Sequence, residues 1–283
     1  MEQDFLTALE TSLGDMSKGQ RAIAEYILDR GAHAAHETAS ALAVDAGVSE
    51  STVVRFAVFM GYEGYPQMKQ ALQSSLRKRM TTVQRIEDVN RRGKEEDIID
   101  GVLDGDADKI LYVKEELDRE AFSRCVDMLL DAKKVYIIGM RSSSILAQFM
   151  NYHLRLLLDN VTLVCPSGGG EVFEYLVNVG KDDAVFAISY PRYSSVTIRA
   201  AEFAKRRGAA VSVLTDSPTS PITGAADAVL VARSDMVSFV DSLVAPMSII
   251  NAIIAYIGKR RPEISEKFRL LEDVWNEYKV YSK

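Results

Sequence analysis

The chain has 283 residues, 47% of them hydrophobic and 26% charged, which is typical of a soluble globular protein with roughly two domains. The first ten residues, MEQDFLTALE, carry three acids and no basic segment ahead of an apolar run, so we expect no signal peptide and a cytoplasmic location. The most apolar stretch, Phe239 to Ile257, contains Asp241, Pro246 and Asn251, which favours a buried core or interface helix over a membrane span.

Charge is unevenly distributed along the chain, although the net charge is −6. Residues 1–50 hold 3 Lys or Arg against 9 Asp or Glu, residues 51–94 hold 9 against 3, and residues 95–283 hold 22 against 28. The basic block at 51–94 is a local electrostatic footprint suited to the phosphates of a nucleic acid. A solvated linker with an excess of arginine would give the same distribution.

Two helices are expected at the start of the chain. Apolar residues from Phe5 to Leu13 share one helical face. Ser17 with Gln20 forms a capping-box pattern ahead of a second apolar series at 22–28.

The next segment predicts a helix-turn-helix. Thr38 can cap a short helix ending near Ala46, Gly47 can take the positive φ that closes it, and Ser49 can cap a further helix to about Met60. Six positions carry the apolar or small residues that two crossed helices need: Leu42, Ala43, Ala46, Gly47, Val53 and Phe56.

The second of these helices would present polar side chains outward. Glu50, Ser51, Thr52 and Arg55 could contact base edges or phosphates if it is a recognition helix. The alternative is a helical hairpin that binds only protein. The basic block begins at Arg55, as DNA binding would require.

Residues 48–72 carry a valine-serine-x-x-threonine-x-x-arginine-phenylalanine helix followed by glycine-aromatic-x-glycine-aromatic-x-x-x-lysine. The matching residues are Val48, Ser49, Thr52, Arg55, Phe56, Gly61, Tyr62, Gly64, Tyr65 and Lys69. This segment resembles the amino-terminal domain of the RpiR family of bacterial transcriptional regulators, which implies binding to double-stranded operator DNA. Many relatives have basic residues where this chain has Ala57 to Met60, so more phosphate contact is expected from Lys69, Arg77, Lys78 and Arg79. The predicted DNA-binding residues are Ser49, Ser51, Thr52, Arg55, Lys69, Arg77 and Lys78.

Apolar periodicity is lost and charge accumulates from Arg77 to Asp106. This pattern predicts a helix-turn-helix domain at 1–78, a linker at 79–106 that is partly helical near 98–103, and a second domain at 107–283. The linker arginines could contact the DNA backbone or simply be solvated.

The second domain is expected to be α/β. Helical patterns at 110–117 and 122–130 precede a predicted strand, Lys134 to Gly139. Further helices are expected at 145–158 and at 197–207. Four more short apolar runs predict strands at 161–165, 184–189, 210–215 and 228–231. The expected fold is therefore an all-α helix-turn-helix domain followed by a doubly wound, parallel, five-stranded sheet with helices on both faces.

Polar loops follow four of the strands, at 141–144 (RSSS), 166–171 (PSGGGE), 189–195 (SYPRYSS) and 215–220 (TDSPTS). Ligands of such sheets bind outside the carboxyl ends of the strands. Free N–H groups at a helix start beside serine hydroxyls suit an anion such as phosphate. An ordinary turn with serines as helix caps is the alternative.

These loops resemble those of the SIS domain, a sugar-isomerase fold that binds phosphosugars and usually accompanies the RpiR helix-turn-helix. Gly139 and Ser143 match the ends of its glycine-x-glycine-x-serine loop, and Arg141 stands at the second glycine. In its serine-x-serine-glycine-x-threonine loop, Pro191 and Arg192 replace the inner serine and glycine. The turn after the fourth strand also matches, at Thr215, Asp216, Ser217, Ser220 and Pro221.

The two arginines change the chemistry that this resemblance implies. Their guanidinium groups could bind an anion by bidentate hydrogen bonds and so preserve the anion site, or their side chains could narrow the space of that site. We expect an anionic small-molecule effector, with a phosphosugar favoured. The predicted effector-binding residues are Arg141, Ser142, Ser143, Ser144, Glu171, Ser189, Arg192, Ser194 and Ser195.

The alternative function is that of a SIS-fold phosphosugar isomerase. Such an enzyme needs a general base, which His153, Glu171 or Glu174 could supply. His153 has the helical spacing of core residues, and a helix-turn-helix favours a regulator over an enzyme. We therefore predict no catalytic residue and no cofactor. Paired DNA half-sites predict a homo-oligomer, at least a dimer, with the apolar helix 239–257 as a candidate interface.

Neither a disulfide nor a metal site is expected. Cys125 and Cys165 lie in apolar patterns without partners at metal-ligand spacing, which predicts two buried, reduced thiols. His33 and His36 flank a loop in which the sequence pattern suggests no acid or cysteine at ligand spacing, so neither histidine is assigned a role.

Overall fold

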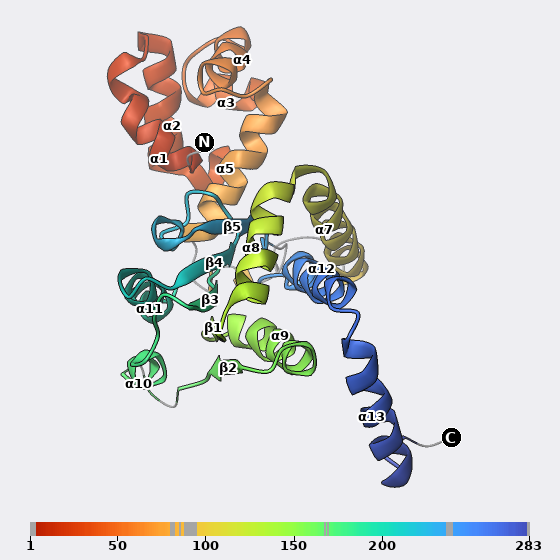
Figure 1. Ribbon diagram of the computed structural model, residues 1–283. Helices are drawn as coiled ribbons and strands as arrows, with labels where there is room; N and C mark the ends of the chain where they lie inside the picture. Colours follow the sequence, from red (N-terminus) through yellow and green to blue (C-terminus); the bar gives the residue numbers. More distant parts are fainter. Residues whose placement is uncertain are drawn as a thin grey trace. The chain divides into compact units, whose positions relative to one another are not determined.

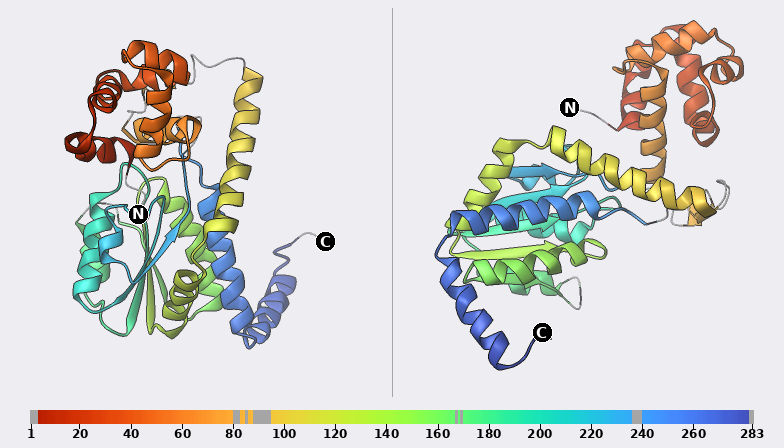
Figure 2. Two further views of the ribbon diagram at one scale, coloured as in Figure 1. Left: turned by 90° about the horizontal axis from the view of Figure 1, so that it is seen from above. Right: turned by 90° about the vertical axis from the view of Figure 1, so that its right-hand side faces the viewer.

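A computed structural model describes residues 4–79, 83–84, 86–87, 95–166, 168, 170–235 and 240–281, with the backbone alone for 32, 77–79 and 95–97. The chain forms two compact units (Figures 1 and 2). The amino-terminal unit is Met1–Val102 with Asp235–Asp241, and the carboxy-terminal unit is Leu103–Ser234 with Ser242–Lys283.

The amino-terminal unit is helical. Its helices are α1 Phe5–Ser12, the 3-10 turn η1 Leu13–Asp15, α2 Lys18–Ala34, α3 Ala39–Asp45, α4 Glu50–Phe59 and α5 Tyr65–Arg79. The predicted capping box is present at the start of α2, where the Ser17 N–H donates to Gln20 Oε1 at 2.8 Å. Thr38 caps α3 as predicted, because its hydroxyl accepts from the N–H of Ala41. Buried apolar side chains from these helices form one core, including Phe5, Leu9, Ile23, Ile27, Leu42, Val53, Phe56, Met68 and Leu72.

The turn between α3 and α4 confirms the helix-turn-helix. Gly47 has a φ of 67°, a conformation that glycine adopts without the steric cost of a Cβ. The Val48 N–H donates to the carbonyl of Ala43 at 2.8 Å and so closes the end of α3. Val53 and Phe56 are completely buried on the inner face of α4. This leaves the other face of α4 to solvent.

The carboxy-terminal unit contains the predicted parallel sheet. Its strands are β1 Lys134–Gly139, β2 Val161–Val164, β3 Asp183–Ile188, β4 Ala210–Thr215 and β5 Ala228–Val231. Their order is β2-β1-β3-β4-β5, and every pairing is parallel. At the junction of the central strands, Gly139 of β1 is level with Ile188 of β3.

Helices cover both faces of the sheet (Figures 1 and 2). One face packs on α8 Arg119–Asp131, α9 Ser143–Leu157 and α12 Val244–Arg260. The other face packs on α10 Glu171–Leu176 and α11 Ser195–Arg206, with the 3-10 turn η2 Thr223–Ala225. Alternate strand residues enter the two cores, as in β1, where Val135 and Ile137 join the first and Tyr136 and Ile138 the second. Burial on both faces explains why the strands read as continuous apolar runs.

Two expectations need correction. The helical patterns at 98–103 and 110–117 belong to one continuous helix, α7 Glu95–Glu116, which Gly101 and Gly105 do not interrupt. Helix α12 needs no correction, because it turns residues such as Ile249 and Ile253 into the core of its own unit, and its role as an oligomer interface stays a prediction.

The second correction concerns a cysteine. Cys165 is exposed at the end of β2, whereas Cys125 is buried as predicted. Burial raises the pKa of the Cys125 thiol to about 12.

Among the described residues, no helix is long and apolar enough to span a membrane. The final helix, α13 Ile264–Glu277, has no fully buried side chain.

Candidate DNA-binding surface and effector site

The outer face of α4 carries the polar side chains that the sequence assigned to DNA. Ser49, Ser51 and Arg55 are exposed, and Thr52 is half-buried. The Ser49 hydroxyl lies 2.9 Å from Ser51 Oγ and 2.8 Å from Thr52 Oγ1. Ser49 occupies the cap position of α4, but its side chain makes no capping bond to the backbone. These hydroxyls therefore form a small cluster at the amino end of the helix, where a phosphate would be favoured by the helix dipole.

Lys69 has a structural role in the free chain. Its ammonium donates to the carbonyl of Glu37 at 2.7 Å and to that of His36 at 3.1 Å. It thereby ties α5 to the loop that follows α2, and a DNA contact would have to compete with these bonds. The side chains of Arg77 and Lys78 lie outside the described residues, so their predicted role stays a prediction.

The predicted effector loops flank a topological switch point. Strands β1 and β3 are neighbours, and the chain leaves β1 toward α9 on one face and β3 toward α11 on the other. In open parallel sheets a ligand crevice forms where the connections diverge in this way. The β1–α9 loop, residues 140–142, and the β3–α11 loop, residues 189–194, follow the paired ends of these strands.

The β1–α9 loop requires a glycine at its start. A Cβ on Gly139 would lie 2.4 Å from the carbonyl oxygen of Ser143, so no larger residue allows α9 to approach the strand this closely. The N–H groups of Ser143, Ser144 and Ile145 donate to the carbonyls of residues 140, 141 and 142 at 3.0–3.2 Å. The expectation of free N–H groups at this helix start is therefore wrong, because the loop winds directly into the helix as a tight turn.

Arg141 and Arg192 share an uncommon backbone conformation. Their φ values are 57° and 65°, the left-handed region that favours glycine, and both side chains are exposed. These are the two positions where the resemblance has glycine. The chain keeps the glycine-like backbone and adds a guanidinium to each loop, although a non-glycine residue in this region costs of order 1–3 kcal/mol.

The serines of the two loops differ in burial. Ser143 is buried, Ser144 is half-buried with its hydroxyl bonded to the Arg141 carbonyl at 2.6 Å, and Ser142 is exposed. Ser194 caps α11 by accepting from the Thr197 N–H at 3.3 Å. Ser195 is exposed in the first turn of α11.

Buried polar groups without partners collect after β3. Ser189 is 2% exposed and Thr197 is completely buried. Within the described part of the chain, neither of these hydroxyls has a hydrogen-bond partner, nor does that of Tyr190. An unsatisfied buried hydroxyl costs about 1–3 kcal/mol, so such a group is expected to have a role that the free protein does not fulfil.

Asp216 holds the loops after β3 and β4 together. The Tyr193 hydroxyl donates to Asp216 Oδ1 at 2.9 Å, and the Thr215 hydroxyl lies 3.3 Å from the same oxygen. Thr215 is also 2.9 Å from Ser220 Oγ. This network fixes the loop that carries Arg192.

The candidate general bases lie on two helices, α10 and α9. Glu171 begins the short helix α10 and Glu174 lies one turn later. His153 is half-buried on α9, with its ring 4.7 Å from that of Phe149 and 5.1 Å from that of Tyr152. Aromatic packing accounts for this histidine, as its helical spacing predicted.

Two groups of polar residues were missed in the sequence. Tyr190 and Thr197 look like ordinary members of a strand end and a helix face, and only their burial without partners singles them out. The expectation that His33 has no acid at ligand spacing is wrong, since Glu37 follows four residues later and its Oε1 lies 3.2 Å from His33 Nε2. That i, i+4 spacing was visible in the sequence.

Comparison with known proteins supports both units. A model of the helix-turn-helix domain of the rpiR family matches residues 3–79, and a model of the SIS domain matches residues 128–256. The chain is 29% identical to the HTH-type transcriptional regulator HexR of Escherichia coli over 222 residues, which are 76% of this chain and 73% of HexR.

Solved structures show the same fold. The NanR protein of Vibrio vulnificus, complexed with ManNAc-6P, aligns with a TM-score of 0.60 and 23% identity over 97% of this chain and 98% of that one. The sugar isomerase domain of an RpiR transcription factor from Sphaerobacter thermophilus aligns with a TM-score of 0.57 and 29% identity over 61% of this chain and 95% of that one. With a helix-turn-helix of the rpiR type followed by a SIS domain, the chain belongs to the RpiR family of transcriptional regulators.

Proposed function

We propose that this regulator reads operator DNA with the outer face of α4 and changes its DNA affinity when an anionic metabolite, a phosphosugar, binds at the β1/β3 switch point. The observation that carries the effector half is the set of buried hydroxyls after β3, above all Ser189, that lack a partner in the described structure. A ligand with several acceptor and donor oxygens would satisfy them. A location in the cytoplasm, where such metabolites and the chromosome meet, follows from this role.

The chemistry of the two loops favours an anion. Each of the two loops at the switch point carries an arginine, Arg141 or Arg192, and guanidinium groups bind phosphate or carboxylate by paired, charge-assisted bonds. Ser189 and the serines of the β1–α9 loop supply neutral hydrogen bonds. NanR was solved with a sugar phosphate, which supports the phosphosugar class for this chain.

Operator binding needs two copies of the chain. Half-sites on DNA are read by paired recognition helices, so the functional unit is at least a dimer. Helix α13 offers an apolar surface for the second copy, because Leu270 is 66% exposed and Val274 is 41% exposed. A double substitution Leu270→Asp, Val274→Asp should therefore lower the mass measured by light scattering, whereas Glu266→Asp on the same helix should not.

The mechanism is a population shift. The effector binds one arrangement of the dimer more tightly than another, and the coupling free energy changes operator affinity by the same amount as the operator changes effector affinity. Sugar phosphates therefore need to be tested with and without DNA.

A direct test combines ligand screening with DNA binding. Thermal unfolding of the full chain would be followed against a panel of sugar phosphates, sugar acids and inorganic phosphate, since a ligand of the folded state raises the transition temperature. Hits would be added to an anisotropy titration of labelled operator DNA. Stabilisation by a sugar phosphate together with a shift in operator affinity supports the proposal. If no compound of the panel raises the transition temperature, the effector part of the proposal is refuted, whereas the DNA-binding part is unaffected.

The isomerase alternative receives less support. The relatives named here are regulators, and His153 is held by aromatic packing on α9. Turnover of a sugar phosphate that disappears in Glu171→Gln would revive it.

A further inference from the structure

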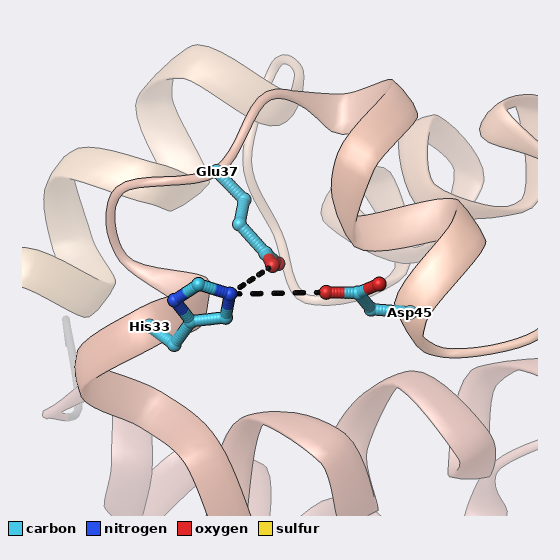
Figure 3. A group of neighbouring side chains, drawn as sticks. All are labelled: His33, Glu37 and Asp45. Carbon is cyan, nitrogen blue, oxygen red and sulfur yellow. Dashed lines mark ion pairs between the residues drawn. The ribbon is translucent and has the colours of Figure 1, made fainter.

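Three side chains of metal-ligand type converge at the carboxy-terminal end of α2 (Figure 3). His33 lies in the last turn of α2, Glu37 in the loop that follows, and Asp45 at the end of α3. The backbone of α2 is non-helical at Arg30, with φ −125° and ψ 36°, so the turn that carries His33 is not a straight continuation of the helix. All three residues belong to the amino-terminal unit.

The distances are close to those of a small coordination sphere. His33 Nε2 lies 3.2 Å from Glu37 Oε1 and 3.8 Å from Asp45 Oδ2, and one ligand atom from each residue lies within 4.8 Å of the others. Bonds of 2.0–2.1 Å at tetrahedral angles would separate neighbouring ligands by about 3.4 Å. Small side-chain rotations would therefore place the three donors around one ion.

The state of Glu37 points to a cation. Its side chain is 7% exposed, its carboxylate is directed toward His33 and Asp45, and its Oε2 is buried with no hydrogen-bond partner in the described structure (Figure 3). A buried carboxylate with an unsatisfied oxygen is costly unless a charge or a metal compensates it. The hydrogen bonds of the nearby Lys69 ammonium go to the backbone carbonyls of His36 and Glu37, so they do not satisfy Glu37 Oε2.

Tyr26 orients the two carboxylates from the middle of α2. Its hydroxyl lies 2.9 Å from Glu37 Oε1 and 3.0 Å from Asp45 Oδ2. A hydroxyl that bridges two ligand oxygens is a typical outer-shell partner of a metal site. Tyr26 is therefore a positioning residue.

We propose that His33, Glu37 and Asp45 bind one divalent transition-metal ion of the Zn²⁺ type. An imidazole nitrogen with two carboxylate oxygens suits zinc and its neighbours, whereas Mg²⁺ and Ca²⁺ prefer oxygen ligands alone. His33 is 67% exposed and borders an open hollow of about 400 Å³ that Asp29, Arg30 and Gly31 also line. The ion enters from this side, and water completes its coordination.

A bound ion would connect α2, the following loop and α3. Helix α3 is the first helix of the helix-turn-helix, so the ion would stabilise the unit that presents α4. This role is independent of the effector site, and the proposal stands or falls separately from the phosphosugar.

The test is a titration of metal-free, full-length protein with Zn²⁺, followed by calorimetry and thermal unfolding. We expect one saturable site per chain and a rise in the transition temperature, with no competition from Mg²⁺ or Ca²⁺. His33→Ala and Asp45→Asn should raise the dissociation constant by more than ~100-fold, beyond what loss of an outer-shell partner typically costs. His36→Ala, which removes a nearby histidine outside the cluster, should bind as the wild type does.

Two outcomes would overturn the proposal. One is the absence of saturable Zn²⁺ binding to the wild-type protein, in which case the three side chains interact only with one another and with Tyr26. The other is a site that survives both His33→Ala and Asp45→Asn, which would locate the metal elsewhere, for instance at the exposed Cys165. His33 and Asp45 are both well exposed, so these variants should keep the helical content of the wild type in circular dichroism.

Discussion

The two candidate binding regions use polar side chains in opposite ways. On α4 and its cap position the serines and Arg55 are exposed, where water can satisfy them in the absence of DNA. After β3, Ser189 and Thr197 are buried and their hydroxyls have no partner in the described structure. The exposed DNA-binding surface therefore destabilises the free protein little. The unsatisfied hydroxyls of the small-molecule site destabilise it until a ligand binds. Substitutions on the α4 face should therefore lower DNA affinity without changing folding stability, whereas substitutions after β3 should change both effector affinity and folding stability.

The largest effect is expected where the effector loop meets its helix. Gly139→Ala should destabilise the carboxy-terminal unit by about 3 kcal/mol, because the new methyl group would overlap the Ser143 carbonyl and force α9 away from β1. Urea unfolding monitored by circular dichroism would measure it. Gly180→Ala is the matched control, since nothing lies within 4 Å of its added Cβ. Equal stability of the two variants would mean that the loop does not pack as described.

The next effect concerns DNA. Arg55→Ala should weaken operator binding about 10- to 100-fold, the usual value of one specific arginine contact, without a change in stability because the side chain is exposed. Arg124→Ala removes the same charge from an exposed position on α8 and serves as the control. Unchanged operator affinity in Arg55→Ala would show that α4 is not the recognition helix.

A smaller effect is expected at Ser189. Ser189→Ala should reduce effector affinity roughly tenfold, since one hydrogen bond to the ligand is lost. The free protein should be as stable as the wild type or more so, because an unsatisfied buried hydroxyl has been removed. Ser248→Ala on α12 removes a hydroxyl that donates to the Val244 carbonyl at 3.0 Å, and it should leave effector affinity unchanged. A loss of stability in Ser189→Ala would mean that this hydroxyl already has a partner in the free protein.

The smallest effect concerns the strained arginine. Arg141→Gly and Arg141→Ala both remove the guanidinium and should weaken effector binding alike. They should differ in stability by about 1 kcal/mol or less in favour of glycine, because alanine keeps the unfavourable φ of 57°. Paired urea titrations would resolve this difference. If the alanine variant proves the more stable, the loop does not hold the left-handed conformation in solution.

Much of this protein followed from its sequence. The helix-turn-helix was predictable because its caps and its glycine are local signals, and Thr38 and Gly47 act as those signals require. Apolar runs separated by helical patterns likewise predicted a parallel sheet, since strands that read as continuous apolar runs and alternate with helices are typical of parallel sheets covered on both faces.

The tertiary structure alone decided which loops meet and which groups lack partners. Strand order is not encoded in any one strand, so the β1/β3 switch point became visible only when the sheet was assembled. The same holds for the exposure of Cys165 and for the approach of Asp45 to His33, twelve positions apart in the chain. Local patterns report what a residue prefers, but burial and contact depend on segments that fold together from distant parts of the sequence.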